Sequence, residues 1–182
     1  EDKHKGQGIS TCATCDGAFF RDKEVIVVGG GDSAMEEATF LTRFCNKVTI
    51  VNRREELRAS QIMADRARDN EKIGWKLNKV VKEWVGEQGK FEGVILTDTL
   101  SNKDEFFNCD GAFIAIGHKP MTNFLSGQIN LDNHGYIVPT ENTMTNVSGI
   151  FAAGDVVDTR YRQAITAAGM GCMAAIDAEK WL

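Results

Sequence analysis

The stretch Glu24-Val25-Ile26-Val27-Val28-Gly29-Gly30-Gly31-Asp32-Ser33-Ala34 decides the fold of this chain. Residues 24–28 are mostly β-branched and do not alternate with polar residues, which is typical of a strand buried on both faces. Three glycines end this strand, and from Asp32 to about Phe44 small and apolar residues recur at helical spacing. A second run of the buried-strand type follows at 47–51. The order strand, helix, strand predicts a βαβ unit with a parallel sheet.

The rest of the chain continues in the same α/β pattern. We expect a polar helix over 60–69, shorter strands over 75–77, 80–85 and 93–97 with a hairpin turn at 86–89, a buried strand over 111–117, a short segment at 135–138, a strand over 150–153 and a helix over 162–182. Gly117 and Pro120 bracket a charged crossing, so a domain boundary is expected there.

The composition excludes several classes of protein. The chain has 182 residues, of which 42% are hydrophobic and 26% charged, as in a globular chain of one domain or one domain plus part of a second. A formal net charge of −5 disfavours nucleic acid as a partner, because phosphates require clustered lysine and arginine. No apolar run is long enough to cross a membrane, and the first residues lack the apolar core of a signal peptide. We therefore expect a cytoplasmic protein with no membrane partner.

The glycine-rich turn has the spacing of a dinucleotide-binding loop, Gly29-x-Gly31-x-x-Ala34. One glycine makes the tight turn, the next lets the backbone approach a pyrophosphate, and the small third residue allows close helix packing. Asp32 and Ser33 open the helix, whose N-terminus favours negative charge. The alternative is a tight strand-to-helix turn that binds nothing.

Three arginines follow the second strand of the unit. That strand ends at Asn52, where an enzyme that uses NAD usually has an acidic residue for the ribose hydroxyl. Arg53, Arg54 and Arg58 come next, and guanidinium groups pair well with a 2′-phosphate. The pattern favours NADPH as the cofactor. A solvated basic face, interrupted by two glutamates, is the alternative.

Two of the five cysteines form a Cys-x-x-Cys pair, Cys12 and Cys15. Thiols at this spacing close a small disulfide ring, and their thiolates are competent in disulfide exchange. Asp16 follows directly and can move the proton that this exchange requires. The remaining cysteines lack the spacing of zinc ligands, so we expect no metal site. Two unrelated core cysteines are the alternative.

A second nucleotide pattern lies near the C-terminus. The expected strand at 150–153 ends at Gly154-Asp155, which places an acid for a ribose or ribityl hydroxyl. Arg162, Gln163 and Ala164 then open a helix rich in small residues, whose N-terminus is suited to the pyrimidine edge of a flavin. An ordinary buried strand with a packing helix is the alternative.

With these pieces in this order, the chain resembles the low-molecular-weight thioredoxin reductases of the pyridine nucleotide–disulfide oxidoreductase family. The motifs that carry the resemblance are Gly8-Ile9-Ser10-Thr11-Cys12-Ala13-Thr14-Cys15-Asp16-Gly17, Gly29-Gly30-Gly31-Asp32-Ser33-Ala34, Arg53-Arg54 with Arg58, Ala115-Ile116-Gly117-His118, and Gly154-Asp155 with Tyr161-Arg162-Gln163-Ala164-Ile165-Thr166. They span nearly all of residues 6–182.

The resemblance implies an α/β fold with three parts. Residues 1–8 are an interdomain crossing, 9–116 a Rossmann-like NADPH-binding domain with a parallel sheet and an antiparallel β-meander, and 117–182 the C-terminal segment of a split FAD-binding α/β domain. Ile116 and Gly117 join the cofactor-binding residues. The family suggests a homodimer.

The resemblance also implies a route for the electrons. A hydride passes from NADPH to FAD, two electrons pass to Cys12 and Cys15, and then to the disulfide of thioredoxin. Cys15 lies nearer the flavin, Cys12 attacks thioredoxin, and Asp16 transfers the proton. Phe19 and Phe20 resemble an apolar contact for thioredoxin, with ordinary core packing as the alternative.

Two departures from the family pattern qualify these expectations. The chain begins after the segment that carries the family's first FAD-binding loop, so alone it is expected to bind FAD poorly. Asn52 stands where the family commonly has histidine. The alternatives left open are an NADPH-binding module without catalysis and a related flavoprotein that serves another carrier.

Overall fold

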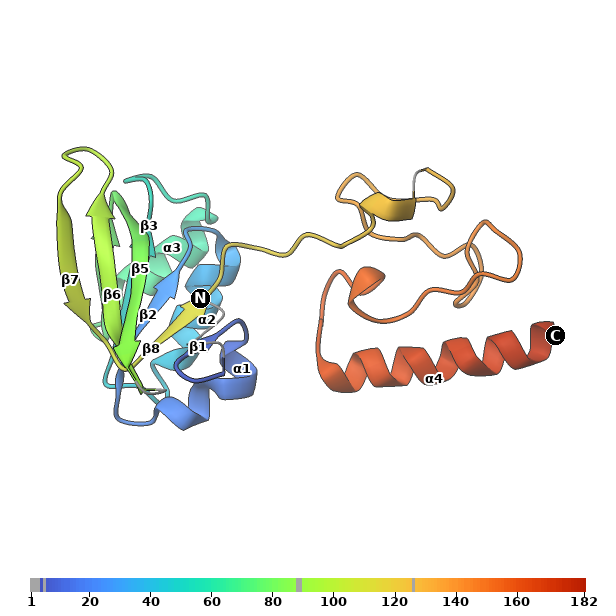
Figure 1. Cartoon of the computed structure of the whole chain (residues 1–182), viewed down its shortest axis with the longest axis horizontal. Coiled ribbons are helices and arrows are strands. Elements are labelled where there is room, and N and C mark those ends of the chain that lie inside the picture. Colours follow the sequence, from blue (N-terminus) through green and yellow to red (C-terminus); the bar gives the residue numbers. More distant parts are fainter. Residues whose placement is uncertain (1–3, 5, 88–89, 126) are drawn as a thin grey trace. The chain divides into compact units, whose positions relative to one another are not determined.

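The computed structural model describes residues 4, 6–87, 90–125 and 127–182 (Figure 1). The chain divides into two compact units, Glu1–Gly117 and His118–Leu182, and each is described by itself below.

The first unit is built on a five-stranded parallel sheet. Its strand order is β1 (Ile9–Ser10), β8 (Gly111–Ile114), β2 (Glu24–Val28), β3 (Lys47–Asn52) and β4 (Ile73–Leu77). Its helices are α1 (Ala13–Asp16), α2 (Asp32–Leu41) and α3 (Gln61–Arg68). The βαβ prediction is confirmed, because β2 and β3 pair in parallel on either side of α2 in sequence.

Both faces of this sheet are covered, which explains the unbroken apolar runs. Val25 and Val27 of β2 point into a cluster with the apolar residues of α2 and α3. Ile26, between them, points into a second cluster with Val94 and Leu96 of a three-stranded sheet. The layers are therefore helices, parallel sheet and antiparallel sheet.

The antiparallel sheet consists of β5 (Lys79–Glu87), β6 (Lys90–Asp98) and β7 (Asp104–Asn108) in that order (Figure 1). This confirms the predicted meander, although two residues of its expected hairpin turn, Gln88 and Gly89, lie outside the described residues. β7 was not predicted, because its acidic start and adjacent Phe106 and Phe107 break the alternation expected of a half-exposed strand.

Two predicted elements of this unit end earlier than expected. α2 ends at Leu41 rather than near Phe44, because the chain leaves the helix in a tight turn in which the N–H of Phe44 bonds the carbonyl of Leu41. β8 ends at Ile114 rather than Gly117, and Gly117 itself takes a positive φ of 96°.

The second unit contains α4 (Ala164–Trp181), as predicted, but the expected strand at 150–153 is wrong. Within residues 150–153 only Phe151 forms a β-bridge, with Met144, while the N–H of Ala152 bonds the carbonyl of Thr143. A local loop thus takes the hydrogen bonds that a neighbouring strand would take in a sheet. No helix in the described ranges is long and apolar enough to span a bilayer.

Packing around β8 should dominate the stability of the first unit. Phe113 is fully buried against Phe20, whereas Phe106 is 53% exposed. We expect F113A to lower the free energy of unfolding by about 3–5 kcal/mol through the cavity it leaves, and F106A by roughly 0.5 kcal/mol. Urea unfolding followed by tryptophan fluorescence in a W181F background, where Trp75 and Trp84 report on this unit, measures both. Equal losses would contradict the assigned core.

Candidate functional site

The glycine loop after β2 is formed by close backbone approaches. Gly29 has a φ of +152°, and a Cβ there would lie 2.3 Å from the carbonyl oxygen of Ala115 and 3.1 Å from the Cβ of Ala34. A Cβ on Gly30 would lie 2.4 Å from Oδ1 of Asn52. Side chains are therefore excluded at both positions, which ties the loop to the ends of β8, α2 and β3.

The ligand side of the loop begins at Gly31. A Cβ built on Gly31 meets no atom within 4 Å, so its backbone is open to an incoming group. The neighbouring Asp32 is committed elsewhere, since its Oδ1 accepts the backbone N–H of Ser60 at 2.7 Å and the Ser60 hydroxyl at 2.9 Å. Ser33 is exposed. Of the residues predicted at this turn, Gly31 and Ser33 are free to face a phosphate.

A hollow of about 510 Å³ lies beside this loop. Its lining residues are Val28, Gly29, Gly30, Val51, Asn52, Arg53, Arg58, Lys79, Val80, Val81, Trp84, Ile114 and Ile116. The structure thus brings together Gly29, Arg53, Arg58 and Ile116 from the predicted set, while Arg54 is exposed outside the lining.

The guanidinium groups of the 53–58 loop, two of which line this hollow, have no acidic partner among the described residues. Arg53, Arg54 and Arg58 are all exposed, and no acidic side chain among the described residues forms an ion pair with any of them. The neighbouring glutamates, Glu55 and Glu56, are exposed as well. Guanidinium groups without a partner are suited to bind phosphate.

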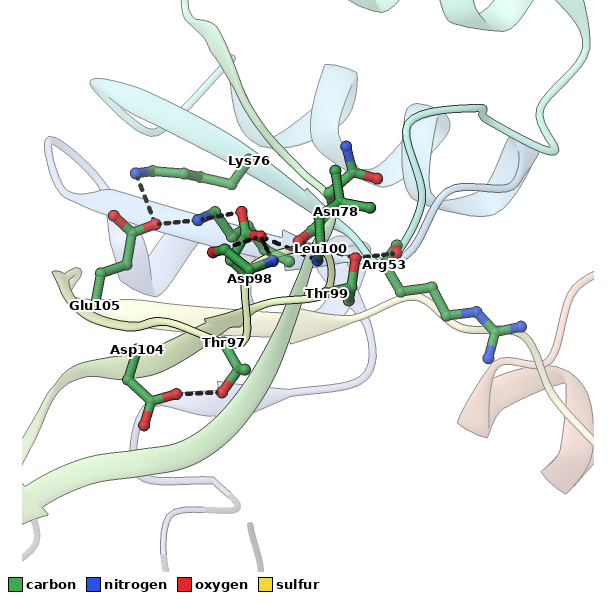
Figure 2. Close-up of polar contacts among 11 residues, drawn as sticks. Arg53, Lys76, Asn78, Thr97, Asp98, Thr99, Leu100, Asp104 and Glu105 are labelled. Atoms are coloured by element: carbon green, nitrogen blue, oxygen red, sulfur yellow. Dashed lines mark hydrogen bonds and ion pairs between the residues drawn. The ribbon is translucent and has the colours of Figure 1, made fainter.

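Residues of β5 that were not predicted also line the hollow. Trp84 and Lys79 of β5 both line the hollow. The Lys79 ammonium lies 3.0 Å from Asp98 and 3.4 Å from Glu105, and Figure 2 shows these two acidic residues. The hydrogen bond to Asp98 raises the pKa of Lys79. The N–H of Ser101 and the Lys79 ammonium hold the pKa of Asp98 well below its usual range. No motif could reveal this side of the hollow, because sheet packing alone brings β5 to the loop.

Cys12 and Cys15 form a disulfide at the surface, with their Cα atoms 5.3 Å apart. Cys12 is the N-cap of α1 and half-buried, and Cys15 is exposed. Ser10 organises the pair, because its hydroxyl donates to Oδ2 of Asp16 at 2.7 Å and accepts the N–H of Cys12 at 3.0 Å. The alternative of two unrelated core cysteines is excluded for this pair. The structure therefore holds a carboxylate next to a surface disulfide.

The two phenylalanines after the disulfide differ in environment. Phe20 is buried, with its ring 5.2 Å from that of Phe113, so it belongs to the core. Phe19 is 76% exposed. Only Phe19 offers an apolar surface beside the disulfide.

Two of the predicted flavin residues of the second unit line a smaller hollow of about 380 Å³. Asp155 and Arg162 both line it, together with His118 and Tyr136. The guanidinium of Arg162 lies 5.2 Å from the centre of the Tyr136 ring, and its Nε is buried without a hydrogen-bond partner.

The hollow is not lined by the other predicted residues, which are Gly117, Gly154, Gln163 and Ala164. Gly154 has a φ of +80°, which suits glycine. Gln163 is the N-cap of α4 in a capping box with Thr166, and Ala164 is the first helical residue. Gly117 ends the first unit.

Comparison with known proteins identifies relatives of the whole chain. The sequence model of the pyridine nucleotide-disulphide oxidoreductase family matches residues 1–171. The chain is 55% identical to a thioredoxin reductase of Mycolicibacterium smegmatis over 100% of its own length and 58% of that protein. It is 52% identical to a bifunctional thioredoxin reductase/thioredoxin of Mycobacterium leprae, covering 97% of this chain and 39% of that protein.

A solved structure gives the same relationship. The thioredoxin reductase of Streptococcus pyogenes superposes with a TM-score of 0.91 at 40% identity, covering 99% of this chain and 59% of that one. The chain thus spans less than two thirds of the length of these relatives.

Thiol reactivity should separate the surface pair from the core cysteines. Burial raises the pKa of the Cys45 thiol to about 11 and that of Cys109 to about 12, so neither supplies thiolate at pH 8. Of the five cysteines, only exposed Cys172 is then free to react with an aromatic disulfide reagent in the oxidised chain. Reduction should add Cys12 and Cys15, and denaturation should add the two core thiols.

The variant C172S serves as the control and should lower each count by one thiol. Rapid reaction of Cys45 or Cys109 in the native chain would contradict the assignment.

Proposed function

Because the chain belongs to the pyridine nucleotide-disulphide oxidoreductase family, we propose that its first unit binds NADPH and reduces thioredoxin through Cys12 and Cys15. The names of its relatives support this function, and one of them carries thioredoxin in the same polypeptide. We further propose that the whole protein is a cytoplasmic homodimer that works as a thioredoxin-disulfide reductase.

The observation that carries the NADPH proposal is the charge of Arg53 and Arg58, which form no ion pair among the described residues and line one hollow together with Gly29 and Gly30. The backbone at Gly31 and the start of α2 would hold the pyrophosphate, and the two guanidiniums the 2′-phosphate. Trp84 and the apolar lining of β5 would exclude water from the same hollow. An acid that would repel the 2′-phosphate is absent from the lining residues.

The second unit offers groups that fit part of a flavin. Asp155 is exposed for a hydroxyl, and the buried Nε of Arg162 is a donor in need of an acceptor. Gly154, Gln163 and Ala164 shape the backbone at the same place. When bound, FAD would supply the two-electron redox chemistry that links a hydride donor to a disulfide.

The chemistry of the disulfide falls to the first unit. Reduction of the Cys12–Cys15 bond takes two electrons and two protons, and the Asp16 carboxylate beside it would exchange a proton at sulfur. One thiolate then attacks the disulfide of thioredoxin and forms a mixed disulfide. Attack by the second thiolate restores the Cys12–Cys15 bond and releases thioredoxin as a dithiol.

Cofactor binding tests the first half of this proposal. Quenching of Trp84 fluorescence on titration should give a lower Kd for NADPH than for NADH. R53L and R58L should each weaken NADPH binding by about 10-fold or more, because a charge-assisted hydrogen bond contributes roughly 1.5–3 kcal/mol, and should leave NADH binding nearly unchanged.

The matched control is R66L, since Arg66 lies on α3 and lines a separate groove. Equal affinity of the wild-type chain for both cofactors would argue against NADPH.

Disulfide exchange tests the second half without a flavin. The chain, chemically reduced and freed of reductant, should pass two electrons to oxidised thioredoxin, so that one thioredoxin dithiol appears for each Cys12–Cys15 disulfide formed. With Cys12 as the attacking thiol, C15S should trap a mixed disulfide with thioredoxin and C12S should not.

C172S should behave as the wild type in this assay. Unimpaired electron transfer by C12S would show that another thiol does the work.

A further inference from the structure

Asn52 is a buried polar residue at the mouth of the cofactor hollow. It is the last residue of β3, its exposed fraction is 9%, and it lines the hollow itself. A buried amide must use its hydrogen-bonding groups or destabilise the fold, so its contacts are informative.

The Asn52 side chain holds the arginine loop through main-chain atoms. Its Nδ2 donates to the carbonyl oxygen of Arg54 at 2.8 Å and to that of Glu56 at 3.1 Å. Both N–H groups of the amide are thereby used. Its Oδ1 lies against Gly30, at the position that a Cβ would occupy.

Other main-chain contacts fix the same loop. The carbonyl of Gly30 accepts the N–H of Arg58 at 2.7 Å and that of Ala59 at 3.0 Å. The hydroxyl of Thr99 donates to the carbonyl of Arg53 at 3.3 Å (Figure 2). Every one of these contacts uses backbone of the loop, so the guanidiniums remain available to a ligand.

We propose that Asn52 is a positioning residue that sets the preference for a 2′-phosphorylated cofactor by fixing the curvature of the 53–58 loop. The inference rests on the proposed NADPH site and adds a residue to it. A loop already held in its binding shape loses little conformational entropy when the phosphate arrives, which favours affinity.

The amide group is suited to this task. It offers two donors to two carbonyls, which neither a carboxylate nor an aliphatic side chain can do. An aspartate here would set negative charge against both carbonyl oxygens and near the 2′-phosphate. The residue therefore acts through the backbone and not by touching the cofactor phosphate.

The test compares the Kd of NADPH and of NADH for N52A, using the full chain and Trp84 quenching. The Kd for NADH divided by the Kd for NADPH should fall by about tenfold towards unity, the equivalent of misplacing one charge-assisted hydrogen bond, because NADH has no phosphate at the loop. The matched control is N46A, which removes an exposed asparagine whose Nδ2 bonds a single carbonyl, that of Asp22, in the same unit. It should leave the ratio unchanged.

The outcomes separate this inference from the cofactor proposal. A wild-type chain without preference for NADPH overturns both. A wild-type preference that N52A retains, or an equal loss of both affinities in N52A, overturns the role of Asn52 and leaves the NADPH site in place. If N52A does not fold, N52S decides, since its shorter hydroxyl cannot reach both carbonyls.

Discussion

The lack of room for any side chain at Gly29 and Gly30 is the constraint on which the site depends. The carbonyl of Ala115 occupies the space above Gly29, and the amide of Asn52 occupies the space above Gly30. These contacts tie the end of β2 to its neighbours β8 and β3. In an open parallel sheet, ligands bind at the carboxyl ends of strands where the strand order reverses. β2 is that strand here, because β3 pairs with it on one side and β8, which comes later in the chain, pairs with it on the other.

The positive charge at the site depends on which charged side chains already have a partner within the fold. The Asp32 carboxylate accepts a hydrogen bond from Ser60, and the Lys79 ammonium forms ion pairs with Asp98 and Glu105. Arg53 and Arg58 form no ion pair among the described residues, because the contacts that hold their loop use its backbone. In the proposed NADPH site, the guanidiniums that would bind the 2′-phosphate are therefore positioned before any ligand binds, in a chain whose net charge is −5.

The fold was predictable where local patterns and tertiary packing agree. The runs at β2 and β3 read as buried strands because both of their faces are covered, and α2 and α4 have the spacing of helices. β7 was not predictable from alternation because its pairing with β6 stabilises a sequence that alone is a poor strand. The run at 150–153 has strand composition, yet its partners in this chain are loop residues.

The motif residues of the candidate site were predictable from the sequence, whereas the other residues that line the hollow were not. Spacing identified Cys12 and Cys15, and the structure joins them. The same approach grouped Arg54 with Arg53 and Arg58, although neighbours in sequence point in different directions once a loop curves, and only the latter two line the hollow. The contributions of Trp84 and Asn52 depend on sheet packing, which spacing does not report.

Amide NMR of the isotopically labelled chain during titration with NADPH tests the central claim most directly. The account predicts that the largest chemical-shift changes occur at residues 30–34 and in the 53–58 loop, and that NADH perturbs the first segment but not the second. Perturbations confined to other parts of the chain, or a 53–58 loop that responds equally to both cofactors, would contradict it.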